Sequence, residues 1–334
     1  MEVTARGICW SKSPNPTISD NHSIDGSGIG SFTTTMLNLS AHTTYYVRAY
    51  ATNDKGTQYG DQKSFRTKSA VPIGGIDGLF SVSESNQVYF SKGNLQYQAS
   101  NDIWRFADNQ YDYSGDDNSN ISSTTDVWID LFGWGTSGFV HGAVCYQPYS
   151  TDQDNAKYFA YGGPAQNLYD KTGTADWGYR AISNGGNTYK KWRSLKNEEW
   201  SYLFNARNTK SGIRYAKATV NYISGIILLP DYWTSSYYNL NNINTTNAEY
   251  SSNLINAYTW ENYLEKHGAI FLPAAGYRFG WALESVGSVG CYWSSSVNSG
   301  SWAYNMNFGN TGQNTNGRQN RYVGNSVRLV CNVE

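Results

Sequence analysis

Amide and hydroxyl side chains are concentrated near the end of the chain. They form hydrogen bonds but do not act as acids or bases. Between Tyr292 and Val330, asparagine occupies positions 298, 305, 307, 310, 314, 316, 320 and 325, and the only charges ahead of the last apolar run are Arg318 and Arg321. Amide and hydroxyl groups donate and accept hydrogen bonds, and aromatic rings add rigid contact area. This is the chemistry of a binding surface. Because Asn and Gly favour turns, the segment is predicted to form short strands and loops that other elements hold in shape.

Groups that could transfer protons or attack a substrate are scattered along the chain. Four histidines, at 22, 42, 141 and 267, form no His/Ser/Asp or His/Cys pattern, and the HExxH and Gly-Lys phosphate-loop motifs are absent. A pair of carboxylates could act as glycosidase acids, although spacing in the sequence does not fix their separation in space. The candidates for such a pair are Asp152, Asp154, Asp170, Asp176, Glu198 and Glu199. The sequence therefore favours a protein that is not an enzyme.

One acidic segment has oxygen ligands of the kind that calcium prefers. In DYDYSGDDNSN these are Asp112, Asp116, Asp117, Asn118 and Asn120. Their spacing does not match an EF-hand loop, so a solvated acidic turn is the favoured interpretation. No metal or other cofactor is predicted.

The cysteines are too few and too scattered for a disulfide scaffold. They stand at Cys9, Cys145, Cys291 and Cys331, without a CxxC pair that would indicate zinc. Cys291 and Cys331 flank the Asn-rich segment and could bridge it. The alternative is four partly buried thiols.

Composition and charge exclude two classes of partner. Charged residues make up 15% of the chain and aromatic residues 16%, with 28 Tyr, 12 Trp and a net charge of −1. No Lys/Arg cluster is present to attract nucleic acid or an anionic membrane. No apolar run approaches the roughly 18 residues of a membrane helix, so no direct membrane insertion is expected. No signal peptide follows Met1, and if the protein is exported we expect its signal to lie upstream.

Residues 1–67 are predicted to form a small all-β domain. In TTYYVRAYATN, Tyr45, Val47 and Ala49 alternate with Tyr46, Arg48 and Tyr50, which indicates a strand with one buried face. With Leu39, this run and the closing SFRT resemble the end of a fibronectin type III domain of secreted Bacteroidetes proteins. The resemblance implies an immunoglobulin-like β-sandwich, here partial, in which the Tyr45 hydroxyl fastens the preceding loop. A spacer role is expected.

A linker over residues 68–77 is predicted to precede the larger domain, residues 78–334. Strand-like runs cover Leu79 to Val82, Gln87 to Ser91, Asn94 to Tyr97 and Trp104 to Ala107. Two helices follow, each with one apolar stripe for core packing. The first, with Ser194 or Asn197 as its cap, has Trp200, Leu203 and Phe204, and the second has Trp260, Tyr263 and Leu264 before the C-cap Gly268.

The order of motifs in this domain resembles a large family of Bacteroidetes surface proteins. The motifs are EEWSYLF, ILLPDYW, WENYLEKHGA, FLPAAGYR, YWSSS and RYVGNSVRLV, and the match covers roughly residues 78 to 332. The family implies an α+β fold, a C-type-lectin-like domain with two helices and short antiparallel strands, distantly similar to the formylglycine-generating enzyme. The cysteine pair of the enzymes is close in sequence, unlike Cys291 and Cys331, so their activity is not transferred.

Several members of this family are the variable proteins of diversity-generating retroelements, in which a reverse transcriptase mutates adenines and so changes Asn codons on one ligand-binding face. The resemblance places the variable positions at Asn298, Ser299, Ser301, Trp302, Asn305, Asn307, Asn310, Asn314, Asn316, Asn320 and Asn325. Trp293, Phe308, Val327, Leu329 and the two helix stripes would carry the fold. Substitution on the face should therefore cost little stability.

The expected function is that of a non-catalytic binding protein on a cell surface, in the extracellular space or on a phage particle. Its partner would be a protein or glycan ligand on another cell or particle, and not nucleic acid. The alternatives are an adhesin of fixed sequence, or a secreted glycan-processing enzyme or accessory domain. The last would use aromatic grooves around Tyr146, Tyr158, Tyr161 and Trp177.

Overall fold

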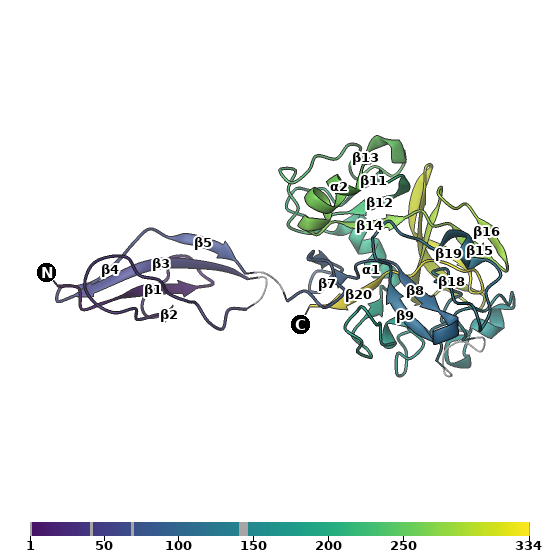
Figure 1. The fold of residues 1–334 in the computed structure, drawn as a ribbon, viewed down its shortest axis with the longest axis horizontal. Coiled ribbons are helices and arrows are strands. Elements are labelled where there is room, and N and C mark those ends of the chain that lie inside the picture. Colours follow the sequence, from purple (N-terminus) through teal and green to yellow (C-terminus); the bar gives the residue numbers. More distant parts are fainter. Residues whose placement is uncertain (1, 41–42, 68–69, 140–145, 334) are drawn as a thin grey trace. The chain divides into compact units, whose positions relative to one another are not determined.

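The chain divides into two units, Met1–Ala70 and Val71–Glu334. The computed structural model describes residues 2–40, 43–67, 70–139 and 146–333 (Figure 1). The fold is mixed and rich in strands, with two helices and several small, mostly antiparallel sheets. None of the helices in these ranges combines the length and hydropathy needed to cross a bilayer.

The first unit contains one sheet. Its strands are β1 (Ala5–Ser11), β2 (Asn21–His22), β3 (Thr44–Asn53), β4 (Gly56–Tyr59) and β5 (Lys63–Arg66). β3 is central, with β1 along one edge and β4 and β5 at opposite ends of the other edge. The described residues form no second sheet, so the expected sandwich is not observed.

Tyr45 connects β3 to the preceding loop. Its hydroxyl accepts a hydrogen bond of 3.0 Å from the backbone N–H of Ser40, as predicted, and its ring stacks on Phe65. The prediction of one buried face on β3 is wrong. Tyr45 and Tyr50, an odd number of residues apart, are both buried, whereas Ala49 is exposed. Without a second sheet, neither face of β3 is fully covered.

The second unit begins earlier than predicted. Residues 71–77, expected to be linker, pack against it: the Ile76 N–H bonds to the Phe90 carbonyl at 2.9 Å, and Ile76 belongs to a buried apolar cluster. Gly74, with φ of +81°, approaches the backbone of Asn184 so closely that a Cβ would lie 2.6 Å from that carbonyl oxygen. Glycine is therefore required where this segment joins the unit.

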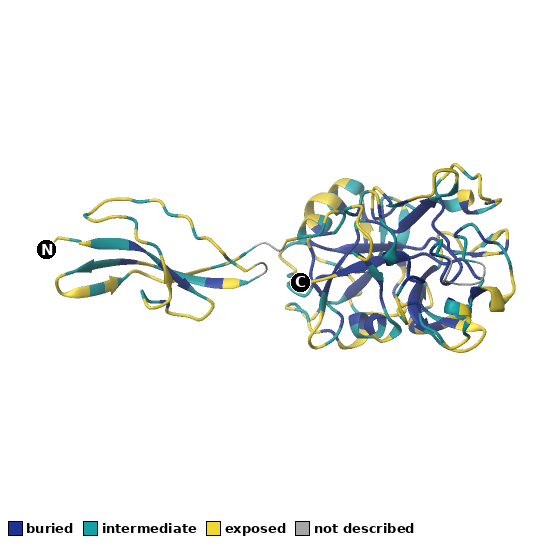
Figure 2. Cartoon of the chain, turned by 90° about the horizontal axis from the view of Figure 1, so that it is seen from below, coloured by how far each residue is buried: buried dark blue, intermediate teal, exposed yellow. Residues whose placement is uncertain are grey.

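Five sheets build the second unit, and their inner faces form its buried core (Figure 2). One joins β10 (Arg193–Ser194), β20 (Leu329–Asn332), β7 (Gln87–Phe90) and β6 (Phe80–Ser81). Another joins β13 (Leu254–Ile255), β11 (Tyr215–Val220), β12 (Ile223–Leu228) and β14 (Ile270–Pro273), with β13 parallel to β11. Two are the pairs β8 (Leu95–Gln98) with β9 (Ile103–Phe106), and β15 (Tyr277–Phe279) with β16 (Ala282–Glu284). The fifth joins β17 (Gly290–Val297), β18 (Trp302–Gly309) and β19 (Gly312–Asn320).

Both predicted helices are present and short. α1 (Asn197–Ser201) continues as the π-helix η6 (Tyr202–Ala206), and α2 (Ala257–Thr259) continues as the π-helix η8 (Trp260–Leu264) and the 3₁₀ turn η9 (Glu265–His267). Further 3₁₀ turns are η1 (Ala99–Asn101), η2 (Gly115–Asn118), η3 (Asn155–Tyr158), η4 (Ala160–Gly162), η5 (Trp177–Tyr179) and η7 (Tyr250–Ser252).

The helix ends agree only in part with the sequence patterns. Gly268 ends the second helix with φ of +82°, as predicted. The N-cap of α1 is Lys196 rather than Ser194 or Asn197, because the Glu199 carboxylate accepts the Lys196 backbone N–H at 2.8 Å. Both apolar stripes are buried except at Tyr263, which is 46% exposed.

Candidate functional site

The Asn-rich segment forms an antiparallel sheet with a shift of register in each strand pair, where its composition predicts short strands and loops. β17 pairs with β18, and β18 pairs with β19, so that the last two strands make a hairpin with its turn at residues 310–311. Met306 and Phe308 are buried with Tyr292 and Trp200 in one apolar cluster. Packing of these residues overrides the weak strand propensity of Asn and Gly. The four residues expected to carry the fold, Trp293, Phe308, Val327 and Leu329, are all buried.

The sheet divides the predicted variable positions by exposure. Ser299, Ser301, Trp302, Asn310, Asn314 and Asn316 are exposed. Asn298, Asn307 and Asn320 are half-buried. Asn305 and Asn325 are both fully buried. The predicted positions therefore do not form one surface.

Asn305 and Asn325 belong to an internal amide network beneath the hairpin. Both donate a side-chain N–H to the Gln319 Oε1, each at 2.6 Å, and the Asn305 Oδ1 accepts from the Asn307 Nδ2 at 3.0 Å. A Cβ at Gly317 would lie 2.0 Å from the Asn307 Nδ2, so this network also requires the glycine. Assigning Asn305 and Asn325 to a binding face was therefore wrong, because they bond inside the protein.

The other side of the hairpin carries the buried Met306 and Phe308 near the turn and, toward its open end, polar and aromatic side chains that are exposed or half-buried. We define the outer hairpin surface as Tyr169, Lys196, Asn197, Trp302, Tyr304, Asn316 and Arg318. Tyr304 and Arg318 are directly opposite each other in β18 and β19 and so point to the same side. The Arg318 guanidinium lies 5.5 Å from the Trp302 ring, which is 38% exposed. This pair holds a cation and a flat ring at the surface.

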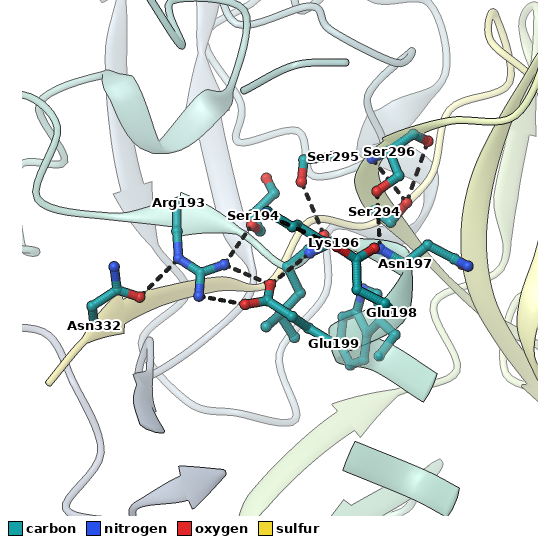
Figure 3. A network of polar contacts seen from close by, with 12 residues as sticks. Arg193, Ser194, Lys196, Asn197, Glu198, Glu199, Ser294, Ser295, Ser296 and Asn332 are labelled. Atoms are coloured by element: carbon teal, nitrogen blue, oxygen red, sulfur yellow. Dashed lines mark hydrogen bonds and ion pairs between the residues drawn. The ribbon is translucent and has the colours of Figure 1, made fainter. Parts of the chain in front are cut away.

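The N-terminus of α1 joins this surface to the rest of the unit. The Asn197 side chain donates to the Asn316 Oδ1 at 2.8 Å. The Asn197 backbone N–H bonds to the Ser296 Oγ at 3.0 Å (Figure 3). The Lys196 Nζ lies 4.7 Å from the Tyr169 ring. Tyr169, Lys196, Asn197 and Tyr304 were missed at the sequence level. Only Tyr304 had a local signal, since it alternates with Trp302 along one strand.

A buried lysine fixes the hairpin turn. Lys217 on β11 is fully buried, and its Nζ donates to the carbonyls of Thr246 at 2.6 Å, Gly312 at 3.3 Å, and Gly309. Burial lowers the pKa of Lys217. All three acceptors are backbone atoms. The lysine can therefore hold the turn whatever side chains occupy positions 310 and 311.

A buried arginine fixes the loop between β17 and β18. Arg321 donates to the carbonyls of Ser299, at 2.6 Å, and Pro164. Its guanidinium lies 4.8 Å from the Trp134 ring and 4.9 Å from the Phe159 ring. Burial lowers its pKa to about 10, so it stays charged at neutral pH. Again the acceptors are backbone carbonyls, so the exposed side chains of the loop are not needed to hold it.

The carboxylates considered for catalysis have structural partners. Asp176 is buried, and its oxygens accept from the Gly178 and Ser194 N–H groups at 2.8 and 3.0 Å. Asp170 accepts from the Asn167 N–H, Asp154 caps η3, and Asp152 pairs with Lys157. Glu199 forms a two-pronged ion pair with Arg193, at 2.6 and 2.7 Å (Figure 3). These five carboxylates thus have hydrogen-bond or ion-pair partners within the chain, and the exposed Glu198 lies 4.0 Å from the Lys196 Nζ.

The remaining sequence candidates are distributed as follows. Tyr158 and Trp177 are fully buried, so they do not line an exposed aromatic groove. Asn118, from the calcium candidate, is buried and bonds to Asp130 at 2.8 Å. Among the described residues, no three His, Cys, Asp or Glu side chains are grouped so that they could hold a metal ion.

The proposed bridge between Cys291 and Cys331 is not formed. Cys291 is a buried thiol facing Gln319, and burial raises its pKa to about 12. Cys145 lies outside the described residues. The Asn-rich segment between Cys291 and Cys331 is thus held by hydrogen bonds and packing instead of a disulfide.

A polar hollow of 530 Å³ borders the outer hairpin surface at Lys196. Its lining residues are Ser85, Asn86, Gln87, Arg193, Lys196, Glu199, Asn332 and Val333. The Arg193 Nε donates to the Asn332 Oδ1 at 2.9 Å, which ties β20 to the ion pair with Glu199 (Figure 3). Because Arg193 and Glu199 bond to each other, this hollow is a weaker candidate for ligand contact than the outer hairpin surface.

Comparison with protein-family models, curated proteins and solved structures finds no match.

Proposed function

We propose that the second unit is a non-catalytic ligand-binding domain and that the outer hairpin surface is its binding face. One observation carries the proposal: the groups that hold the hairpin in place are not the side chains exposed on it. Lys217 and Arg321 bond to backbone carbonyls, and Asn305 bonds inside the sheet. The exposed positions are therefore free to serve contact with a partner.

The chemistry of the face fits recognition of another macromolecule. Trp302, Tyr304 and Tyr169 provide rigid aromatic area, and Asn316 and Arg318 provide donors and acceptors. Tyr, Trp and Arg are the residues that most often dominate binding energy. We expect a protein or glycan ligand on another cell or particle, and a domain that works outside the cell or on a phage particle.

The motif order of residues 78 to 332 supports the finer part of the proposal. It resembles C-type-lectin-like variable proteins of diversity-generating retroelements, and we propose that this chain has that fold and that its exposed positions are diversified. The first unit would act as a spacer of fibronectin type III type. An adhesin of fixed sequence is the second candidate, since the same rigid hairpin would serve a single ligand equally well.

Sequencing the 3′ end of the gene from a natural population, with its flanking DNA, separates the two candidates. Under diversification, copies differ at codons for exposed positions such as Asn314 and Asn316, matching adenines in a nearby template. Selection for folding would keep Asn305 and Asn325 in most functional copies. An invariant segment without a template or reverse transcriptase would leave the fixed adhesin and contradict diversification.

A further inference from the structure

A segment of the first unit has the residue types and the alternating exposure of a β-strand but no strand partner among the described residues. Ser31 to Leu37, SFTTTML, lies outside any assigned helix, strand or turn, and its residues alternate between exposed and half-buried (Figure 2). Phe32, Thr34 and Met36 are the half-buried set. No backbone N–H or C=O of these seven residues bonds to another described residue.

The space between this segment and the sheet is incompletely filled. A hollow of 470 Å³ is lined by Ile29, Phe32, Tyr50 and Tyr59 among others, and another of 330 Å³ is lined by Trp10, Thr35 and Leu37 among others. Ile29 and Leu37 are 93% and 68% exposed. These hollows therefore leave room for further side chains between Ser31–Leu37 and the sheet.

The segment also lacks the features that normally protect a strand edge. From Gly26 to Thr44 the sequence contains no Lys, Arg, Asp, Glu or Pro. Charges, prolines and bulges are the usual means by which proteins prevent pairing at an open edge. An uncharged run of Phe and Thr with unpaired backbone groups favours the addition of another strand.

The order of residues in the segment favours a second copy as the partner. In an antiparallel pair centred on Thr34, Phe32 lies opposite Met36 and Thr33 lies opposite Thr35. Phe32 and Met36 then lie on the sheet-facing side of both copies with Thr34 between them, and Thr33 and Thr35 face solvent. Such pairing is self-complementary, as a two-fold symmetric interface requires.

We infer that Ser31–Leu37 pairs antiparallel with the same segment of a second copy, joining two chains through their first units. This goes beyond ligand binding, because it brings two binding faces together and makes attachment bivalent. The inference does not depend on the function proposed for the second unit.

The test uses two variants of the full chain at the exposed positions Thr33 and Thr35, and one control variant elsewhere. In the variant with both Thr33→Lys and Thr35→Lys, each lysine lies opposite another lysine, which opposes pairing. In the variant with Thr33→Lys and Thr35→Glu, every lysine lies opposite a glutamate, which permits pairing. Ser19→Lys, in an exposed turn, is the control for added charge.

Sedimentation velocity over a range of concentrations gives the result. As the concentration increases, the average mass of the wild type should rise from the monomer mass of 37.3 kDa toward twice that value. The double-lysine variant should bind itself at least about tenfold more weakly, while the lysine–glutamate variant and Ser19→Lys should associate like the wild type. A wild type that stays monomeric, or a double-lysine variant that associates unchanged, would overturn the inference. Circular dichroism of each variant verifies that the sheet is intact.

Discussion

Asn197, at the start of α1, donates its side-chain amide to the side-chain oxygen of Asn316 on β19, 2.8 Å away and 119 residues later in the chain. This bond fixes the outer strand of the hairpin against the helix. Because Asn316, one of the exposed positions, accepts this bond, its substitution should lower the free energy of unfolding more than substitution of Asn314. Together with the bond from the Asn205 Nδ2 to the Thr315 Oγ1 at 3.3 Å, the Asn197–Asn316 bond attaches β19 to the helical segment Asn197–Ala206.

Asn305 should be far less tolerant of substitution than Asn314. Asn305→Ala removes one of the two donors to the Gln319 Oε1 and the acceptor of the half-buried Asn307 amide, and should lower the free energy of unfolding by about 1–3 kcal/mol. Asn314→Ala, at an exposed site of the same hairpin, should change it by less than about 0.5 kcal/mol. Urea denaturation of both variants checks the prediction. Equal effects would show that the inner network does not support the sheet.

Lys217 should be required to hold the hairpin turn. Lys217→Met keeps most of the side-chain volume but removes the donor to the Gly309 and Gly312 carbonyls, at a cost of about 2–3 kcal/mol. Hydrogen exchange should quicken at the turn. The matched control is Lys210→Met at an exposed site, which should behave like the wild type. A turn that remains protected in Lys217→Met would contradict this role.

Asp130 should make the stability depend on pH. Burial raises the pKa of its carboxyl to about 6, despite hydrogen bonds from Asn118 and Ser114 that favour the charged form. Between its ordinary pKa near 4 and about 6, the folded protein binds more protons at this site than the unfolded chain. The free energy of unfolding therefore falls as pH rises through this window, by at most about 3 kcal/mol.

The comparison of wild type with Asp130→Asn isolates that contribution. The stability of the wild type minus that of the variant should decrease as the pH rises from about 4 to about 7. Denaturant titrations at several pH values measure both proteins under identical conditions. A difference that stays constant with pH would mean that Asp130 titrates normally in the folded state.

Cys291 should be unreactive until the domain unfolds. Only the thiolate attacks alkylating reagents, and a buried thiol with a pKa near 12 forms almost none at neutral pH. Mass spectrometry after iodoacetamide treatment should find Cys291 unmodified in the native protein and modified in guanidinium. Reductant should leave the melting temperature unchanged. A peptide that links Cys291 to Cys331 would contradict the structure.

Local patterns in the sequence were sufficient for the helices and several strands. Trp200, Leu203 and Phe204 at helical spacing, and Gly268 after the second helix, depend only on neighbours in the chain. The bond from Ser40 to the Tyr45 hydroxyl is likewise a local feature. Such elements are predictable because their main determinants lie within a few residues of one another.

The candidate site could be predicted only in outline. Composition identified the segment but not the side of the sheet to which each Asn points, because the inward orientation of Asn305 and Asn307 depends on contacts with Gln319 and with each other. Asn197 joins the surface through bonds to Ser296 and Asn316, about a hundred residues away in sequence. Only the tertiary arrangement separates structural asparagines from exposed ones.

The most direct test of a tolerant binding face is a displayed library of the full chain with Ser299, Ser301, Trp302, Asn310, Asn314 and Arg318 randomised together. A comparison library randomises the buried Asn305 and Asn325 and the half-buried Gln319 that joins them. After protease treatment to remove unfolded members, the first library should retain most of its members and the second should lose most of them. Selection on immobilised lysozyme, as a probe protein, should then yield binders from the first library. Equal losses in both libraries, or a folded first library without binders, would contradict the account.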